Sequence, residues 1–479
     1  MKKFFITLLG LFIAFGAFAQ SGTTGNLTWT ISDGTLTISG TGAMPDYISY
    51  SAPWYSYKSS ITAAVVSEGV TSIGRAAFYF CNSMTSVAIP NTVTSIGVGA
   101  FRGCNILASV TIPGSVTSIR SLAFEYCNSL TSVTIPAGVT NIEEGAFAGC
   151  SALTAINVNA TNVAYSSVDG ILYDKTQTSL VQCPGAKSGA VVIPSSVTSI
   201  GNDAFFGCSG LTSVTIPNSV SSIGAHAFSG CSGLTSVTIP GSVTSIGEVP
   251  FGGCSALTAI NVDASYGDTN GDGVINGSDA YDGAYVSVDG ILYNKTQTTL
   301  IQCPGGKSGA VAIPGSVTSI GTYAFTNCSS LTSVTIGNGV TSIGDRAFLA
   351  CSGLTKITVK NPTPPTLGIS TFLNVDTATC VLEVPSGAKA AYKAANQWKD
   401  FRTINEVDFS TADYVLINGV LWATRNLDVG GGFVANPENY GALFQWGRTA
   451  AGRVSRASSI TTTLDTTDNH GNDKYILAT

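Results

Sequence analysis

The chain has 479 residues, a net charge of −6 and only 10% charged residues, whereas about 25% is typical of soluble proteins. No run or stripe of Lys and Arg occurs, so the electrostatic footprint of a nucleic-acid-binding protein is missing and that class is excluded. The 54 glycines favour turns and strands over amphipathic helices. The length suffices for one long repeat stack with attachments.

The first twenty residues have the pattern of a secretory signal. Two lysines precede an apolar run from Phe4 to Phe18, and the small-residue pattern Ala-Phe-Ala stands directly before Gln20. The run is short for a membrane span of about 20 residues. We predict a signal peptide over residues 1–20, a secreted or cell-surface location, and no transmembrane segment after the signal is removed.

Residues 21–60 predict a hairpin that acts as an N-terminal cap. Apolar residues alternate on both sides of an Asp33-Gly34 pair, which is a hairpin signal. These apolar residues are Leu27, Trp29, Ile31, Leu36 and Ile38.

A 23-residue pattern then recurs along most of the chain, and its clearest copy runs from Cys127 to Gly149. Counted at the second inward strand residue, the copies fall at Val66, Ile89, Ile112, Ile135, Val158, Ile193, Ile216, Ile239, Val262, Ile313, Ile336 and Val359. Nine of the eleven steps are 23 residues, and the other two are 35 and 51. A fixed period of this length predicts a solenoid. We expect about twelve coils over residues 61–360, mainly β with short turns and helical turns.

Each residue type in a coil has a structural role. Val133 and Ile135 alternate with Thr134, as in a strand with one buried face. Pro136 ends this strand because it lacks a backbone donor. The next apolar residues, up to Phe147, turn the chain back and point inward. Stacked coils therefore predict ladders of identical side chains, spaced by about 4.8 Å.

The motif LxxVxIPxxVxxIGxxAFxxC resembles the bacterial leucine-rich repeat of the BspA type, which is also described from treponemal surface proteins. The resemblance covers Gly25 to Glu406, because Thr35–Gly42 resembles the usual opening of the family and Val384–Phe401 its usual closing segment. It implies a leucine-rich-repeat-like stack with a C-terminal cap over residues 361–407. Ser386 is expected to N-cap a helix through residues 388–395 of this cap.

The two long steps share a module. Ser167–Pro184 recurs as Ser287–Pro304, and in the first copy two apolar runs flank Asp174–Thr178. This pattern predicts hairpins that stand out from the stack, as insertions near residues 163–190 and 264–310. A binding element and a scaffold decoration are both consistent with it.

Residues 408–479 do not follow the repeat. Tyr414–Asn426 and Tyr440–Arg448 resemble the start of the Fibrobacter succinogenes major paralogous domain. The segment is short for that family, so we interpret it as a partial domain and carry no function over to it.

The chain has twelve cysteines, which in an exported protein raises the question of disulfides. Nine of them occupy one phase of the repeat: Cys81, Cys104, Cys127, Cys150, Cys208, Cys231, Cys254, Cys328 and Cys351. A small apolar residue at one ladder position explains them as reduced structural thiols. The state of Cys183, Cys303 and Cys380 is left open by the sequence.

The sharpest chemical signal lies inside the 51-residue step. Oxygen donors occur at the spacing of a calcium loop, with a glycine at the sharp turn. They are the side chains of Asp268, Asn270, Asp272, Asn276 and Asp279 and the carbonyl of Val274. The spacing resembles an EF-hand or dockerin loop, although position 12 is Asp rather than Glu and a single loop occurs without clear flanking helices. We predict a Ca²⁺ site; the alternative is an Asp/Asn/Gly-rich surface turn.

Enzyme chemistry has little support. The two histidines, His226 and His470, are far apart in sequence, and no nucleophile elbow, phosphate loop or metal-ligand pair occurs. We therefore predict a protein that is not an enzyme. The exposed strand position of the coils forms an uncharged face with recurring threonine, as at Thr111 and Thr134. This face could contact a partner, or reflect only the strand preference of threonine.

Members of the BspA-type family act as adhesins, so the resemblance implies an exported scaffold for protein–protein interaction. It implies adhesion to host or neighbouring-cell macromolecules, with extracellular or surface proteins as partners. The alternative is a glycan-binding accessory protein in polysaccharide use. The repeats contain no Trp, which favours protein partners over glycans.

The calcium prediction is tested by isothermal titration calorimetry of the purified chain with Ca²⁺. We expect heat from binding, and its loss in Asp272→Ala, because that carboxylate is the donor at position 5. A wild-type protein without Ca²⁺ uptake would contradict the site.

Overall fold

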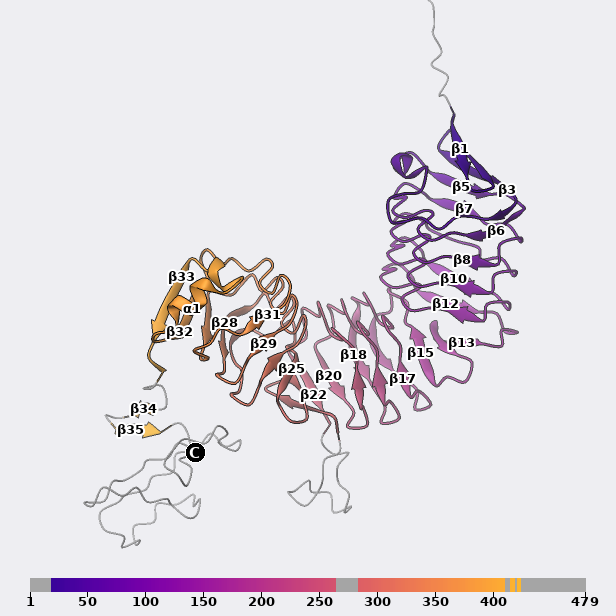
Figure 1. Ribbon diagram of the computed structural model, residues 1–479. Helices are drawn as coiled ribbons and strands as arrows, with labels where there is room; N and C mark the ends of the chain where they lie inside the picture. Colours follow the sequence, from indigo (N-terminus) through magenta and orange to yellow (C-terminus); the bar gives the residue numbers. More distant parts are fainter. Residues whose placement is uncertain (1–18, 264–282, 410–413, 418–419, 424–479) are drawn as a thin grey trace, which may run out of the picture. The chain divides into compact units, whose positions relative to one another are not determined.

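The computed structural model describes residues 19–263, 283–409, 414–417 and 420–423. The chain divides into two compact units, and each is a stack of coils (Figure 1). Unit 1 comprises residues up to 189 and 194–211, and unit 2 comprises 190–193 and the chain from 212 onward. The predicted signal peptide lies outside the described residues, apart from its last two.

The first sheet of unit 1 begins as an antiparallel meander and continues as a parallel ladder. Strands β1, β2 and β3 form the meander, and β3 then pairs in parallel with β5, and β5 with β7. Further along, β10 and β12 pair in parallel. The bounds are β1 Gln20–Thr24, β2 Leu27–Ser32, β3 Thr35–Gly40, β5 Ala63–Val66, β7 Ser86–Ala88, β10 Ser132–Ile135 and β12 Ala155–Val158.

A second parallel sheet runs along the other side of the coils, in the order β11-β9-β8-β6-β4. Its strands are β4 Gly42–Ala43, β6 Val70–Ile73, β8 Ser95–Ile96, β9 Ser118–Ile119 and β11 Asn141–Ile142. Threonine hydroxyls at the edge of these strands bind the preceding coil. Thr94 Oγ1 donates to the carbonyl of Thr71 at 3.1 Å, and Thr117 Oγ1 to that of Thr94 at 3.2 Å. Much of the threonine content therefore links coils.

Unit 2 repeats this arrangement. Its longest parallel sheet has the order β26-β28-β30-β32-β33, while β16 pairs with β18 and β20 with β22. These strands are β16 Gly189–Val192, β18 Leu211–Thr215, β20 Ser236–Ile239, β22 Ala259–Val262, β26 Gly309–Ala312, β28 Leu331–Ile336, β30 Lys356–Val359, β32 Val381–Pro385 and β33 Thr403–Val407. The second side has β19 Ser222–Ile223, β21 Ser245–Ile246, β27 Ser319–Ile320, β29 Ser342–Ile343 and β31 Thr366–Leu367.

The solenoid prediction is confirmed, with about 14 turns of roughly 23 residues. This exceeds the twelve copies counted, because strands of the end segments also join the ladder. β3 pairs in parallel with β5 at one end, and β32 and β33 extend the sheet beyond β30 at the other.

The core of each unit is a stack of phenylalanine rings. Phe78, Phe101, Phe124 and Phe147 are almost parallel in unit 1, with ring centroids 5.0, 5.1 and 5.4 Å apart. In unit 2, Phe348 stacks on Phe325 at 4.8 Å. All of these side chains are buried. Because each ring contacts its counterpart one coil away, the register between coils is fixed by side-chain shape as well as by backbone pairing.

A tryptophan ends each ring stack. Trp54 lies 6.2 Å from Phe78, and its indole N–H donates to the carbonyl of Ala77 at 2.7 Å. Trp398 lies 5.1 Å from Phe372, and its indole N–H donates to the carbonyl of Pro365 at 2.9 Å. A large ring with one hydrogen-bonding edge suits the boundary between core and cap.

The C-terminal cap contains helix α1 (Lys389–Ala394) and the 3-10 turn η3 (Trp398–Asp400). The expected N-cap at Ser386 is wrong, because Ala388 occupies the N-cap position without a side-chain hydrogen bond. Instead, Glu406 from β33 accepts hydrogen bonds from the backbone N–H of Gly387 and of Lys389, both at 3.0 Å. A carboxylate from another strand thus satisfies the helix start, which no local sequence pattern could indicate.

The two hairpin modules do not stand out from the stack as predicted. In each module three strands form an antiparallel meander whose last strand joins the second sheet: β15 pairs with β17 (Ser199–Ile200) and β25 with β27. The strands are β13 Tyr165–Val168, β14 Ile171–Asp174, β15 Ser179–Gln182, β23 Tyr285–Val288, β24 Ile291–Asn294 and β25 Thr299–Gln302. The apolar residues of β14 are buried. Burial of these residues against the coils explains why the hairpins are part of the solenoid and do not project from it.

All twelve cysteines are free and buried, in agreement with the prediction for the nine in the repeat. Several of these thiols donate to a phenylalanine carbonyl of the preceding coil, for example Cys127 Sγ to Phe101 at 3.3 Å. Burial raises the pKa of Cys81 to about 12, and the pKa of Cys104 is raised well above its ordinary value. Cys183, Cys303 and Cys380 are also free.

These thiols should be unreactive in the native protein, because the thiolate is the reactive form and burial disfavours it. We expect iodoacetamide at about pH 8 to alkylate the chain only after denaturation, and intact mass to be the same with and without reductant. Rapid labelling of the native protein, or disulfide-linked masses, would contradict this assignment.

Candidate functional site

The predicted calcium ligands, from Asp268 to Asp279, lie outside the described residues, so that site stays a prediction. Within the described ranges, no group of three or more His, Cys, Asp and Glu could hold a metal ion. His226 lies in a turn with a positive φ of 53° and belongs to no such group.

The turns of the hairpin modules are structural. Asp174 accepts hydrogen bonds from the Thr176 and Thr178 hydroxyls, and from the Ser179 N–H at 2.8 Å. In the second module Asn294 occupies the same place and accepts from the N–H groups of Thr298 and Thr299. The uncharged amide of Asn294 holds its turn in the same way as the carboxylate of Asp174 does. We therefore assign Asp174 to the turn and not to the binding of a cation.

The uncharged strand face is present, and it is interrupted near the end of unit 2. Thr111 and Thr134 are exposed. Thr358 is buried and donates to Glu383 at 2.7 Å, while Lys356 Nζ lies 3.6 Å from the same carboxylate. Among the described residues, no buried polar side chain without a partner lies on this face.

The turn after the second sheet is the part of the coil in which the repeat is least regular. Each coil has two residues here with positive φ, a conformation that glycine adopts easily and bulky residues adopt at a cost. Glycine occupies the second of these positions in several coils, such as Gly103 and Gly149, but Phe80 and Tyr126 occupy it in others, at φ 54° and 59°. Asn327 and Ala350 have positive φ at this position too, so the conformation belongs to the repeat and the residue type varies.

These strained residues belong to two groups of contacting side chains in unit 1, which together we call the aromatic surface. It consists of Tyr50, Tyr55, Tyr79, Phe80, Arg102, Tyr126 and Phe206. Tyr50 is 60% exposed, although its neighbours Tyr55 and Tyr79 lie 5.3 and 5.2 Å from its ring in edge contacts. Tyr126 and Phe206 form a similar contact at 6.0 Å.

Glycines make room for these rings. A Cβ on Gly103 would lie 3.0 Å from the ring of Phe80, and one on Gly149 would lie 2.7 Å from the ring of Tyr126. Rings and glycines therefore alternate over the four coils that contain Phe80, Gly103, Tyr126 and Gly149. Beside the aromatic surface, Ile48 is 81% exposed and lines a hollow of about 290 Å³ together with Arg75.

A partly buried ion pair lies within the aromatic surface. Arg102 Nε is 2.5 Å from Glu125 Oε2, and the guanidinium lies over the Tyr79 ring at 5.8 Å. The contact lacks the geometry of a hydrogen bond, and neither of the two atoms has another hydrogen-bond partner. The Glu125 side chain is 8% exposed and that of Arg102 is 33% exposed.

Burial raises the pKa of Glu125 to about 7, because desolvation disfavours the carboxylate. The charge of Arg102 acts in the opposite direction, and that of Asp203 raises the pKa further. The short ion pair would by itself favour a low value, but desolvation of the carboxylate is the larger effect. Glu125 therefore titrates near neutrality.

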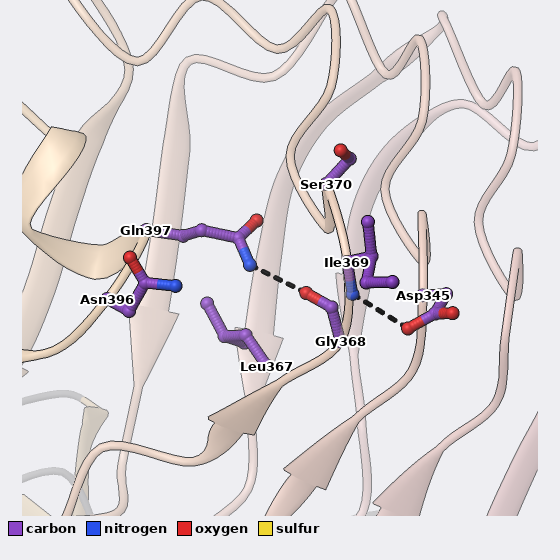
Figure 2. Close-up of a pocket in the computed structure, with 7 residues that line it drawn as sticks. All are labelled: Asp345, Leu367, Gly368, Ile369, Ser370, Asn396 and Gln397. Carbon is purple, nitrogen blue, oxygen red and sulfur yellow. Dashed lines mark hydrogen bonds between the residues drawn. The ribbon is translucent and has the colours of Figure 1, made fainter.

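Unit 2 has a larger hollow, of about 480 Å³, beside the C-terminal cap (Figure 2). Its lining includes Asp345, Ile369 and Gln397. Figure 2 shows that two of the polar side chains are engaged with the loop itself: Asp345 accepts from the Ile369 N–H at 2.7 Å, and Gln397 donates to the carbonyl of Gly368 at 2.6 Å. These groups hold the last coil against the cap, so we assign this hollow to the architecture.

Sequence reasoning missed the aromatic surface, since its residues lie in variable positions of the repeat. The sequence signal that could have indicated this surface is the pair of residues between the ladder Phe and the ladder Cys. This pair is Tyr-Phe at residues 79–80 and Glu-Tyr at 125–126, against Ala-Gly at 148–149.

Comparisons with known proteins agree on the architecture. A family model described as "BspA type Leucine rich repeat region" matches in six copies, over residues 51–168, 183–272 and 307–393, more than half of the chain. A leucine-rich repeat protein from Eubacterium ventriosum is 28% identical with a TM-score of 0.52, and the match covers 74% of this chain and 95% of that one.

Two further solved structures are more distant. A leucine rich cell surface protein from Faecalibacterium prausnitzii is 24% identical, with a TM-score of 0.39 and coverage of 71% and 94%. The pneumococcal vaccine antigen PcpA is 18% identical, with a TM-score of 0.42 and coverage of 81% and 98%. No curated protein matches. No helix in the described part of the chain is long and apolar enough to cross a membrane.

The raised pKa of Glu125 predicts a pH-dependent stability. The native protein holds the Glu125 proton more tightly than the unfolded chain does. Protonation of Glu125 therefore stabilises the fold fully below pH 4.5, and this stabilisation is lost as the pH rises through 7. Glu125→Gln should therefore be more stable, relative to wild type, at pH 8 than at pH 5, as measured by the urea midpoint.

Glu143→Gln is the matched control, because Glu143 pairs with Arg120 at 2.5 Å. Partial desolvation of Glu143 is outweighed by hydrogen bonds from Ser121 and by the Arg120 charge, so its pKa is lowered. The effect of this substitution should change little between pH 5 and 8, since the carboxylate is ionised in the native state throughout and mostly ionised in the unfolded chain. Identical pH profiles for wild type and Glu125→Gln would contradict the assignment.

Proposed function

The chain belongs to the BspA type leucine-rich repeat family, and we therefore propose that it is an exported, non-catalytic scaffold that binds other proteins at a cell surface. A stack of coils offers an extended surface for contact, and its interior residues serve packing. The partners proposed are proteins of a host or of neighbouring cells, so the role is adhesion.

The aromatic surface is the observation that carries protein binding. Residues that dominate protein interfaces are enriched in Tyr, Trp and Arg, and four tyrosines, two phenylalanines and Arg102 meet here. Their rings are held in edge contacts with one another, so little conformational entropy is lost when a partner binds. The exposed Tyr50 and Ile48 supply apolar area that is not covered within unit 1.

The chemistry of the described residues supports a non-catalytic role. The twelve thiols are buried, and the pKa values resolved for thiols such as Cys127 and Cys351 are raised, so they are poor nucleophiles. Glu125 has a perturbed pKa, but it is paired with Arg102 inside an aromatic environment.

Export is supported by the signal-like pattern of residues 1–20. The calcium loop from Asp268 to Asp279 is proposed as a Ca²⁺ site on its ligand spacing. A glycan-binding role is the alternative. It has weaker support, because Trp29, Trp54 and Trp398 are buried and so are not available to stack on sugars.

Binding is tested with the purified chain on a panel of extracellular matrix proteins and on a glycan array. We expect a protein ligand whose affinity falls about thirtyfold or more in Tyr50→Ala, the loss typical of a hot-spot residue. Tyr50 is mostly exposed, so the variant should keep its thermal stability.

Thr134→Ala is the control, because Thr134 is exposed on the strand face rather than on the aromatic surface. It should bind as wild type does. Equal affinity of Tyr50→Ala and wild type would refute the aromatic surface as the site, and binding to glycans alone would favour the alternative function.

A further inference from the structure

The first sheet of unit 1 ends in an open edge. Strand β1 is the last strand in the order β1-β2-β3-β5-β7 and lies at the outer end of this stack (Figure 1). Among the described residues, no strand pairs with its outer side. The last strand of the corresponding sheet in unit 2, β33, is different, because it packs against helix α1 and its Glu406 binds the start of that helix.

The hairpin between β1 and β2 decides which backbone groups of β1 point outward. Its loop is the two-residue turn Gly25-Asn26, in which Gly25 has a positive φ of 58°. The residues that flank such a loop form a hydrogen-bonded pair, and hydrogen-bonded pairs then recur at every second position. These pairs are Thr24 with Leu27, Gly22 with Trp29, and Gln20 with Ile31. The N–H and C=O groups of Ser21 and Thr23 therefore point away from β2.

The usual protections of an edge strand are missing from β1. Ser21 and Thr23 are exposed, and the strand has the sequence Gln-Ser-Gly-Thr-Thr, without a charged residue or a proline. Its register with β2 is continuous and contains no bulge. Natural proteins usually block an edge with a lysine, a proline, a bulge or a covering element. An open edge without these features is a template for another strand.

A buried donor without an acceptor lies against the same strand. The Trp29 side chain is 7% exposed, and its indole N–H has no hydrogen-bond partner. In contrast, the indole N–H groups of Trp54 and Trp398 donate to backbone carbonyls. A Cβ on Gly22 would lie 2.8 Å from Trp29 Nε1, so the indole nitrogen reaches the edge strand. This edge is therefore incomplete in a side chain as well as in the backbone.

Strand β1 is complementary to itself. It runs antiparallel to β2, so a further antiparallel strand continues the order of the meander. With Gly22 on a two-fold axis, Ser21 of one copy lies opposite Thr23 of the other, and their outward groups form four backbone hydrogen bonds. The side chains that meet there are hydroxyls, which pair well across strands. The central Gly22 pair brings no side chains together, and no charges oppose the contact.

We propose that two copies of the chain associate through β1, as an antiparallel strand pair centred on Gly22 that joins their first sheets. The partner is thus a second copy of this chain. The contact involves no residue of the aromatic surface, so it goes beyond the proposed binding of other proteins and does not depend on it. Ser21 and Thr23 also follow the predicted signal peptide, so removal of the signal leaves both residues in place.

The association is expected to be weak. An interface based on a strand of five residues belongs to the small, transient class, and its hydrogen bonds compete with the lost translational and rotational freedom. We expect a dissociation constant of about 10–100 µM. Such an affinity is sufficient where many copies are held close together, because tethering raises the effective concentration to about the millimolar range.

Sedimentation velocity of the purified chain measures the association, at concentrations from about a tenth to about ten times the expected dissociation constant. Wild type should pass from monomer to dimer over this range. Thr23→Pro should weaken the dimer at least about tenfold, because proline removes two of the four intermolecular hydrogen bonds by symmetry. The N–H that it removes points outward, so the pairing of β1 with β2 is retained.

Thr23→Val is the matched control, because valine keeps the backbone N–H and suits a strand. It should dimerise as wild type does. Ser21→Lys is a second test that leaves the backbone unchanged. Its two lysines would lie about 7–8 Å apart across the pair, so the dimer should weaken at low salt and recover partly at high salt. Circular dichroism and thermal unfolding show whether each variant folds, and Ser21→Lys keeps the test valid if Thr23→Pro does not.

The inference is overturned if wild type stays monomeric at the highest concentration. It is also overturned if the dimer persists unchanged in folded Thr23→Pro or in Ser21→Lys at low salt, since the contact would then lie elsewhere. Tyr50→Ala should dimerise as wild type does. Loss of the dimer in Tyr50→Ala would place the contact on the aromatic surface and refute the role of β1. None of these results decides the proposed binding of other proteins, which the matrix panel tests separately.

Discussion

The contact of each side chain with its own counterpart one coil away is the constraint on which the structure depends. Phe101 stacks between Phe78 and Phe124 at about 5 Å on either side, and this spacing is close to the separation of hydrogen-bonded strands. The thiol of Cys127 and the hydroxyl of Thr117 reach back to carbonyls of the preceding coil. One repeated register therefore satisfies packing, the thiols and the threonines together.

The same constraint leaves a few positions free. In each coil the two residues between the ladder Phe and the ladder Cys pair with the next coil through their backbones. Their side chains take no part in the ring stack, and there the chain varies between Ala-Gly and Glu-Tyr. Because neighbouring coils bring these positions together, residues 23 apart in sequence form one surface. Glycines such as Gly149 leave room for rings such as that of Tyr126.

Some expectations depended on burial that sequence reasoning did not weigh. The hairpin modules were predicted from the turn at Asp174–Thr178, and the turn is present, but the apolar residues Ile171 and Leu172 fold the strands into the wall. Ser386 has the right residue type for an N-cap, yet Glu406 satisfies the helix start from a neighbouring strand. In both cases a distant part of the chain competed with a local signal.

The sequence by itself determined the solenoid, the phase of its core and the free state of the ladder thiols, because these result from a period that repeats identical contacts. Only the tertiary structure decided which variable residues meet. Arg102 and Glu125 are 23 residues apart, and nothing in their local sequence marks them as partners. Stacking brings them together, buries the carboxyl and raises its pKa, since desolvation depends on every coil packed around it.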